Sequence, residues 1–323
     1  MALVLLALAA AGGAYWWLHQ PVVAGDKPIE LEIEPGTTPR NVARAVRQAG
    51  MQVNPDWLYW WFRLSGQDRK IRAGNYEIPP GTTPHSLLAR LVRGEETQRV
   101  ITIVEGWNFR QVRAALAREE FLKHDTADLA PEAIMAALGQ PELPAEGRFY
   151  PDTYAYAKGS SELALLRRAQ AAMDKRLEAI WALREADSPL KTPAELLTLA
   201  SIVEKETGKA DDRGQVAGVF INRLRVGMLL QTDPTVIYGL GEKFDGNLRK
   251  KDLLADTPWN TYTRAGLPPT PISMPGKASL MAAVQPAKTR ALYFVAKGDG
   301  SSHFSESLDE HNRAVNQYQR GGK

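Results

Sequence analysis

The sequence of 323 residues lacks cysteine and contains only five histidines. Without cysteine the chain forms no disulfide, no thiolate nucleophile and no cysteine-ligated metal site, and the redox compartment stays undecided. The histidines do not recur at the spacing that places two ligands on one helix face. The sequence therefore predicts neither a bound metal nor another cofactor.

The excess of positive over negative charge is also small. The 40 Lys and Arg residues against 37 Asp and Glu residues leave a formal net charge of +3, and the basic residues are scattered. Proteins that bind nucleic acid carry a concentrated basic surface, so we expect no nucleic-acid partner. The hydrophobic share of 44% is typical of a folded protein. The length allows two packed units, since single cores rarely grow beyond roughly 250 residues.

The first 18 residues carry no charged side chain. The stretch Ala2–Leu18 consists mainly of Leu, Ala and Val, and it ends near the aromatic run Tyr15–Trp17. Its length is at the short limit of a membrane-spanning helix, about 17 to 25 residues, and aromatic residues are enriched at membrane interfaces. We expect a transmembrane signal-anchor at residues 1–18. A cleaved signal peptide is the alternative, although the small residues at 9–13 would place cleavage before bulky aromatics.

A short motif recurs after a linker at residues 19–27. The run Pro-Gly-Thr-Thr-Pro stands at 35–39 and again at 80–84. Each copy follows an alternating apolar pattern typical of a strand and precedes apolar positions at helical spacing. The second threonine of each copy can cap the helix, with proline in the first helical position. These patterns predict a small strand-helix module over residues 28–96.

An aromatic run from Trp57 to Phe62 lies between the two copies. Its rings could stack on sugars. A helix that packs them into a small core is the other explanation, and we expect this one because large apolar side chains are mostly buried.

From about residue 98 the pattern indicates a larger α+β domain that continues to residue 323. A strand is predicted at 100–104, and amphipathic helices are predicted at 109–122 and 163–185. Between these helices, the loop at 146–154 combines turn residues with aromatics. Such loops often line clefts.

A helix at residues 193–207 carries the candidate chemistry. Thr192 and Glu195 form the signature of a capping box around Pro193, and Gly208 follows the last helical residue. Apolar residues at helical spacing indicate that one face of this helix is buried.

Two carboxylates, Glu204 and Glu206, stand in the last turn of this helix, on opposite flanks of its apolar face. Helical geometry alone does not choose between them. A carboxyl group beside a buried apolar surface loses solvation, which raises its pKa and suits it to protonate a leaving oxygen near neutral pH. Most single glutamates at helix ends are solvated surface charges, so the candidate depends on the downstream segments.

Downstream of this helix, polar residues stand between prolines and glycines, at 230–239 and 258–276. Polar side chains on stiff loops can hydrogen-bond the hydroxyl and acetamido groups of a sugar. Ordinary turn chemistry is the alternative for each of them.

Five segments resemble one known family, the MltG/YceG-like endolytic murein transglycosylases. The segments are ASIVEKET (200–207), VFINRL (219–224), LQTDPTVIYG (230–239), NTYTRAGLPPTPISMPG (260–276) and AVQPAKTRALYFVAKGDGSSHFSESLDEHN (283–312). The resemblance covers residue 98 to the end. It extends more loosely over the N-terminal stretch and the 28–96 module, which is LysM-like in the family. The N-terminus departs from the family, because no basic residue precedes its apolar stretch.

The resemblance implies that Glu206, the second acidic residue of the Glu-Lys-Glu triplet, is the catalytic acid and base. It also places Asn260, Gln231 and Asp233 among cleft residues that contact substrate, and Tyr262 stands in the same block as Asn260. An amide both donates and accepts hydrogen bonds, as an acetamido partner requires. A turn-capping role is the alternative for Asn260.

The reaction that the resemblance implies cleaves the bond between N-acetylmuramic acid and N-acetylglucosamine in peptidoglycan without water. One carboxylic acid protonates the glycosidic oxygen. The resulting carboxylate takes the proton of the C6 hydroxyl, which attacks the anomeric carbon and closes a 1,6-anhydro ring. A second carboxylate is not required, unlike in hydrolases that use two acids.

The resemblance further implies peptidoglycan glycan strands as the substrate, a terminase role during cell-wall synthesis, and peptidoglycan synthases as further partners. With the anchor retained, we expect a single-pass position in the inner membrane of a bacterium, with the catalytic domain outside the cytoplasm. Two other functions stay open at this point. A muramidase-type hydrolase would use Asp233 as nucleophile or base opposite Glu206. A non-catalytic peptidoglycan-binding scaffold would use the 28–96 module to tether the protein to a synthesis complex.

Overall fold

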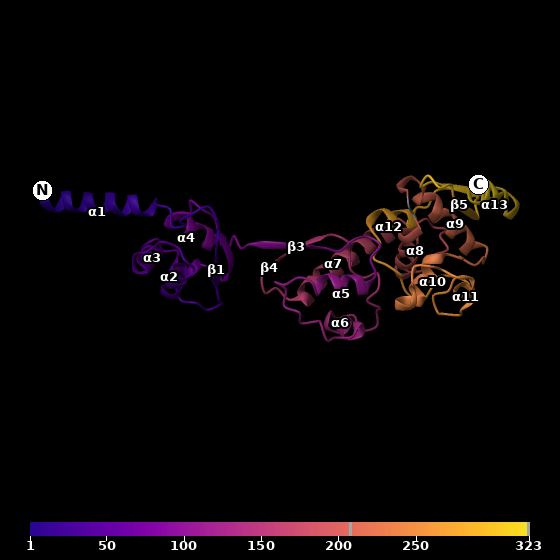
Figure 1. Ribbon diagram of the computed structural model, residues 1–323, viewed down its shortest axis with the longest axis horizontal. Helices are drawn as coiled ribbons and strands as arrows, with labels where there is room; N and C mark the ends of the chain where they lie inside the picture. The colour runs from indigo at the N-terminus through magenta and orange to yellow at the C-terminus, as the bar shows by residue number, and fades with distance from the viewer. Residues whose placement is uncertain (207–208, 322–323) are drawn as a thin grey trace. The chain divides into compact units, whose positions relative to one another are not determined.

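The computed structural model describes residues 1–206 and 209–321. The chain forms two compact units, Met1–Val100 with Ala155–Ser160, and Ile101–Tyr154 with Ser161–Lys323 (Figure 1). Helices dominate both units and the sheets are two-stranded, so the predicted α+β class is confirmed. The predicted domain bounds at 19–27, 28–96 and 98–323 stay predictions.

The first unit is built around an antiparallel strand pair and three helices, which follow an N-terminal helix. Its elements are α1 (Ala2–Leu18), β1 (Ile29–Ile33), α2 (Pro39–Gln48), α3 (Pro55–Leu64), β2 (Gly74–Ile78) and α4 (Pro84–Arg93), with a 3-10 turn at Asp68–Lys70. The strands pair in register from Ile29 opposite Ile78 to Ile33 opposite Gly74. Their inward side chains pack on the helices in one apolar core.

The repeated motif has the same local structure in both copies. Thr38 accepts the N–H of Asn41 at 3.4 Å, and Thr83 accepts the N–H of Ser86 at 3.2 Å, so both predicted caps are confirmed. Each motif also needs its glycine. Gly36 and Gly81 stand in the turn before the cap with positive φ values of 84° and 79°, which favour glycine.

The aromatic run in α3 is buried only in part, so the expectation of a helix that buries its aromatics was partly wrong. Leu58 and Phe62 stand four residues apart and share the buried face. Trp57 and Trp60 lie on the other face and are 59% and 55% exposed. Together with the end of α1, they line an apolar hollow of about 530 Å³.

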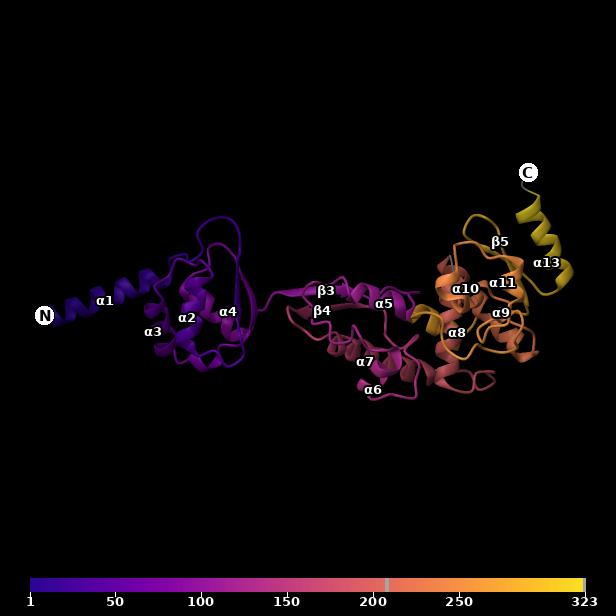
Figure 2. The same cartoon turned by 60° about the horizontal axis from the view of Figure 1, so that its bottom comes forward.

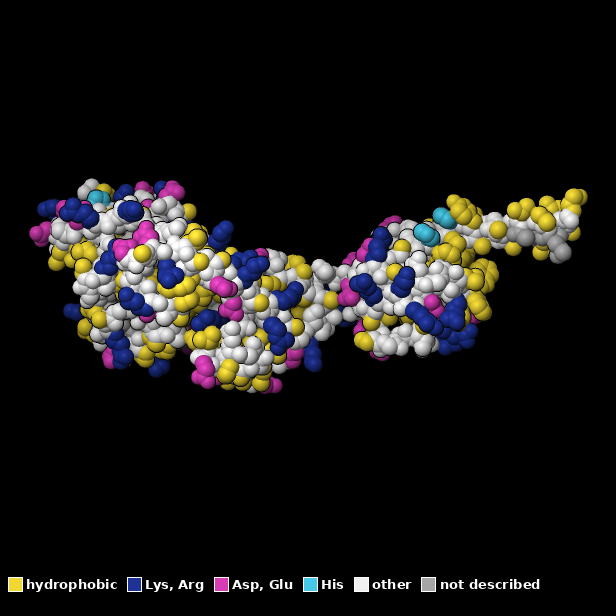
Figure 3. Space-filling model, turned by 180° about the vertical axis from the view of Figure 1, so that it is seen from behind, with side chains coloured by type: hydrophobic (Ala, Val, Ile, Leu, Met, Phe, Trp, Pro, Cys, Tyr) yellow, Lys and Arg dark blue, Asp and Glu magenta, His cyan; other side chains and the backbone are white. Residues whose placement is uncertain are grey.

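The N-terminal helix α1 has 17 residues. Among the described residues, no helix has the length and hydrophobicity that a membrane crossing requires. Figure 3 shows hydrophobic side chains along α1 and no charged ones on the face in view.

The second unit consists mainly of helices. The helices are α5 (Phe109–Leu116), α6 (Pro131–Ala137), α7 (Glu162–Trp181), α8 (Pro193–Glu206), α9 (Arg213–Arg225), α10 (Asp233–Leu240), α11 (Lys250–Leu254), α12 (Lys277–Val284) and α13 (Leu308–Val315). Short 3-10 turns lie at Ala210–Asp212 and Gly241–Lys243, and a π-helical turn lies at Asn316–Arg320. The strands β5 (Tyr293–Ala296) and β6 (Ser302–Ser305) pair antiparallel.

The remaining strand pair, β3 (Gln98–Thr102) with β4 (Thr153–Ala157), contains the boundary between the units. Two predicted spans here need correction. The strand begins two residues before the predicted start at 100. The helix predicted at 109–122 ends at Leu116, because the next residues fold into turns.

The helix α8 is the centre of the second unit. Every residue from Leu196 to Val203 is buried, so the helix is enclosed rather than covered on one face. Figures 1 and 2 show α9, α10 and α12 close to it, and side chains of these helices share its core.

The start of α8 has only half of the predicted capping box. Thr192 accepts the N–H of Glu195 at 3.2 Å, whereas the Glu195 carboxylate accepts the N–H of Lys191 and not that of Thr192. The predicted last residue Thr207 and the predicted stop Gly208 lie outside the described residues.

Candidate active site

Glu206 ends α8 as a partly buried side chain. The hydroxyl of Thr232, in the loop before α10, donates a hydrogen bond to Glu206 Oε1. Burial raises the pKa of Glu206, and the negative charge of Asp233 raises it further, whereas the Thr232 bond and the Arg223 charge oppose the change. Glu206 thus holds its proton to a higher pH than an ordinary glutamate, as a general acid must.

The backbone beside Thr232 is strained. Among the described residues, Gln231 is the one non-glycine residue with a positive φ, 49°. Its N–H donates to Thr261 O at 3.1 Å, and the Thr232 N–H donates to Thr261 Oγ1, also at 3.1 Å. Such conformations persist where the surroundings enforce them, and they cluster at functional sites. The two hydrogen bonds to Thr261 hold this backbone and thereby fix the position from which Thr232 reaches Glu206.

Arg223 of α9 fastens the segment that leads to this loop. Its side chain is almost fully buried, and Nη1 donates to Leu230 O at 2.7 Å while Nε donates to Leu292 O at 2.7 Å. Its positive charge also acts on Glu206. No sequence pattern had indicated a role for Arg223 or Thr232. An arginine within the apolar run of α9 was the signal available, because a buried guanidinium needs several acceptors.

Asp233 and Tyr262 lie beside the same carboxyl. The hydroxyl of Tyr262 donates to Asp233 Oδ1 at 2.5 Å. Burial and the Asp233 charge raise the pKa of Tyr262, so this hydroxyl stays protonated and remains a donor. The structure thus brings Gln231, Asp233 and Tyr262 to the Glu206 end of α8.

Asn260 differs from the other candidates, because its side chain is fully buried. Its amide nitrogen donates to Leu253 O at 3.0 Å and to Ala255 O at 2.7 Å, and its oxygen accepts the N–H of Tyr262 at 2.8 Å. These backbone groups occupy the amide, which leaves no free face for an acetamido group. The geometry favours the turn-capping alternative, in which Asn260 positions Tyr262.

The two carboxylates in the last turn of α8, Glu204 and Glu206, have different hydrogen-bond partners. Glu204 accepts the N–H of Gly276 at 2.9 Å, so it holds the loop before α12. A side chain at Gly276 would collide with Glu105, whose carboxyl lies 1.8 Å from the Cβ position. Burial, followed by the Glu204 charge, raises the pKa of Glu105. Glu204 is therefore engaged with the backbone, whereas Glu206 is engaged with a side-chain hydroxyl.

Within residues 1–206 and 209–321, no three His, Asp or Glu side chains converge as ligands for a metal ion. The fold and the site together define a class of protein suited to acid–base chemistry, in which one desolvated carboxyl ends a buried helix and faces polar loops.

The particular family follows from comparison with known proteins. Residues 31–317 match the profile of the YceG-like family, and the chain belongs to this family. The crystal structure of a yceG-like protein from Listeria monocytogenes aligns with a TM-score of 0.59 at 30% identity, over 90% of this chain and 99% of that one.

Two relatives are named endolytic murein transglycosylase. The protein from Bacillus subtilis is 31% identical over 328 aligned residues, which cover 95% of this chain and 90% of the relative. The protein from Streptococcus pneumoniae is 27% identical over 352 aligned residues, which cover 97% of this chain and 63% of the relative.

Proposed function

We propose that this protein is an endolytic murein transglycosylase that cleaves peptidoglycan glycan strands with Glu206 as its acid and base. The names of the relatives support the reaction class. The observation that carries the residue assignment is the desolvated carboxyl of Glu206, held by Thr232 beside the strained Gln231. We further propose a terminase role during cell-wall synthesis.

The reaction begins with Glu206 protonated, as its raised pKa favours. The proton passes from Glu206 to the glycosidic oxygen as the bond to the anomeric carbon breaks. The new carboxylate then accepts the proton of the muramic acid C6 hydroxyl, whose oxygen bonds to the anomeric carbon. Thr232 and Arg223 stabilise this carboxylate between the two proton transfers. Attack within one sugar ring benefits from proximity, with effective molarities up to about 10⁵ to 10⁸ M.

Asp233 gives the hydrolase alternative a specific basis, because it lies close enough to Glu206 to raise its pKa. In a hydrolase Asp233 would act as nucleophile or base, and the product would have a reducing muramic acid end. The hydrogen bond from Tyr262 occupies one Asp233 oxygen and weakens its nucleophilicity. We therefore propose that Asp233 and Tyr262 bind and orient the substrate.

The test is product analysis by mass spectrometry after digestion of purified sacculi with the full chain. Long fragments with 1,6-anhydromuramic ends support the proposal, and reducing ends support hydrolysis. Glu206→Gln should abolish cleavage. Glu204→Gln is the matched control, because it alters a carboxylate of the same helical turn that binds backbone. Equal losses in both variants would overturn the assignment of Glu206.

For the first unit we propose attachment to the bacterial inner membrane through α1, with the remainder outside the cytoplasm. The uncharged α1 and the neighbouring exposed Trp57 and Trp60 support this, since tryptophan favours the membrane interface. The module at 28–96 would bind glycan as a LysM-like unit and bring the enzyme to peptidoglycan synthases. Cell fractionation with Trp57→Gln/Trp60→Gln tests the attachment, and an unchanged membrane fraction would remove these residues from it.

A further inference from the structure

A hollow of about 740 Å³ in the second unit is lined by residues that the Glu206 chemistry does not use. We call it the α5–α10 hollow, since residues of α5 and α10 line it with the loop that precedes Asn260. Its lining includes Phe109, Arg110, Glu146, Tyr238, Trp259 and Thr270. A mostly apolar cavity of this size with a few placed polar groups is typical of a small-ligand site.

The floor of the hollow combines two aromatic rings with a buried carboxyl. Tyr238 and Trp259 meet edge to face, with ring centroids 5.4 Å apart. The Tyr238 hydroxyl donates to Glu146 Oε2 at 3.1 Å, and the Trp259 N–H donates to Thr270 at 2.9 Å. These bonds fix both rings, so the hollow is organised before a ligand arrives.

Glu146 itself is anchored at the start of α5. Its two carboxyl oxygens each lie 3.1 Å from the N–H of Phe109, the first residue of the helix. The free N–H groups of a helix start favour such an acceptor. Glu146 thereby couples α5 to Tyr238 of α10 and closes the floor of the hollow.

The hollow and the Glu206 site share their supporting elements. The helix α10 begins beside Glu206 at Asp233 and carries Tyr238 five residues later, which is about 7.5 Å along the helix axis. The loop that supplies Trp259 to the hollow continues to Thr261, which holds Thr232. A chain-like substrate at Glu206 could therefore extend along α10 to the hollow.

Charges at the rim of the hollow balance. The positive charges of Arg110 and Arg113 are offset by two glutamates. Glu132 also lines the hollow, and Glu242 pairs with Arg110 at 3.3 Å. A rim of this kind gives no preference for a strongly acidic peptide. Aromatic faces with scattered donors and acceptors suit the apolar face and the polar substituents of an uncharged sugar.

We propose that the α5–α10 hollow binds an uncharged N-acetylhexosamine ring of the glycan strand, away from the bond that Glu206 cleaves. The identity of the strand rests on the proposed function, but the binding does not require turnover. Occupation of the hollow holds the strand on both sides of α10. Cleavage would then fall within a strand rather than at its last disaccharide.

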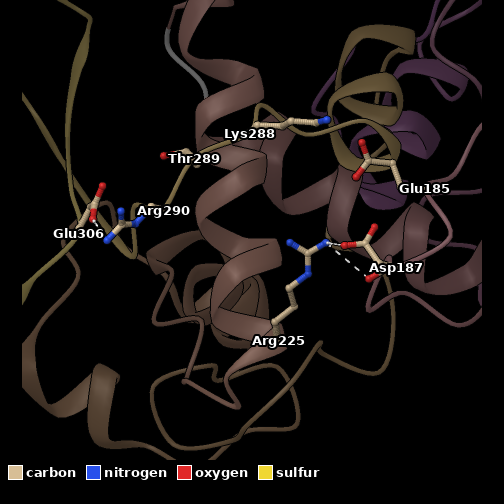
Figure 4. Close-up of a pocket in the computed structure, with 7 residues that line it drawn as sticks. All are labelled: Glu185, Asp187, Arg225, Lys288, Thr289, Arg290 and Glu306. Carbon is tan, nitrogen blue, oxygen red and sulfur yellow. Dashed lines mark hydrogen bonds and ion pairs between the residues drawn. The ribbon is translucent and has the colours of Figure 1, made fainter.

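A second hollow provides the contrast. It encloses about 860 Å³ and is lined by Glu185, Asp187, Arg225, Lys288, Thr289, Arg290 and Glu306 (Figure 4). None of these side chains is aromatic, and Arg290 pairs with Glu306 at 3.2 Å. Arg290 is therefore a matched control for Arg110, because both are exposed arginines paired with glutamate beside a hollow.

The experiment is calorimetric titration of the full chain in detergent with chitotetraose, the tetramer of N-acetylglucosamine, in a Glu206→Gln background. We expect Trp259→Leu to raise Kd about tenfold, Arg110→Ala about threefold, and Trp259→Phe less than Trp259→Leu because it keeps a flat ring. Arg290→Ala should leave Kd unchanged. Melting curves check folding, and Arg110→Ala decides the outcome if Trp259→Leu fails to fold.

Absence of chitotetraose binding, wild-type Kd in Arg110→Ala, or an equal loss in Arg290→Ala would overturn the proposal. The two proposals fail separately. If the hollow variants bind normally while Glu206→Gln abolishes anhydro ends, the hollow proposal fails alone. If Glu206→Gln still yields anhydro ends while the hollow variants lose binding, the catalytic assignment fails alone.

Discussion

Glu206 and Glu146 are two desolvated carboxyls near opposite ends of α10. Glu206 contacts Thr232, directly before the helix, and Glu146 contacts Tyr238, near its end. Each accepts a hydrogen bond from a hydroxyl, Thr232 for Glu206 and Tyr238 for Glu146. Burial is the largest cause of the raised pKa in both, and the pKa of Glu146 reaches about 7.

The two carboxyls differ in what else surrounds them. Glu146 also accepts the Phe109 N–H at the start of α5, so it joins two helices. Glu206 lies beside the strained Gln231 and a second acid, Asp233, and Arg223 holds the segment that precedes them. The comparison teaches that a raised pKa alone does not mark a catalytic acid. Strain and neighbouring polar groups distinguish the catalytic candidate from the structural one.

The largest expected effect separates the two carboxyls by activity. Glu206→Gln should lower turnover by at least about a thousandfold, because the amide cannot donate and recover a proton. Glu146→Gln should lower turnover less than tenfold, as its role is positioning. Release of anhydromuramic ends from sacculi measures both. Comparable losses in the two variants would break the distinction.

The next effect concerns stability against pH. The folded state holds the Glu146 proton more tightly than the unfolded chain, so stability falls as pH rises from about 4.5 to 7. The difference between a pKa of 4.5 in the unfolded chain and about 7 in the folded state corresponds to a loss of up to about 3 kcal/mol of unfolding free energy. Glu146→Gln should remove this part of the decline. Urea unfolding of both proteins at pH 4.5, 6 and 7.5 measures it, and parallel pH profiles would contradict the raised pKa.

The next prediction concerns Asn260→Ala. This residue lies in the loop that supplies Trp259 to the hollow beside Glu146 and Thr261 to the Glu206 site. The variant loses three part-buried hydrogen bonds and leaves the Leu253 and Ala255 carbonyls without this donor, which costs about 2 kcal/mol of stability. It should also lower turnover, because Tyr262 loses its position. Asn222→Ala is the matched control, since Asn222 also donates to two backbone carbonyls. Normal melting with reduced turnover in Asn260→Ala would instead restore Asn260 as a substrate ligand.

The smallest effect tests the hydroxyl on Glu206. Thr232→Val keeps the shape and removes the donor, so the pKa of Glu206 should rise further and turnover should fall about tenfold. The alkaline limb of the kcat/KM profile should move to higher pH. Thr198→Val, which removes a hydroxyl bonded to Ala194 O inside α8, should leave the profile unchanged. An unshifted limb in Thr232→Val would show that the titrating acid is another group.

Local features of the fold were predictable because they depend on neighbouring residues. The caps at Thr38 and Thr83 and the strands around them require only short-range patterns. Helical periodicity left the choice between Glu204 and Glu206 open, since two positions of one helical turn have equivalent sequence surroundings. Their different partners, Gly276 and Thr232, come from segments distant in the chain.

By itself the sequence determined the α+β class, the helix that presents Glu206 and the family, since periodicity, caps and motifs are properties of the chain. Only the tertiary structure decided that Asn260 is buried in its own loop, that Arg223 holds the segment before Gln231, and that Glu146 shares α10 with Glu206. The physical reason is that burial and hydrogen-bond saturation depend on which distant segments pack together, and these contacts set both the pKa of a carboxyl and the freedom of an amide to bind a ligand.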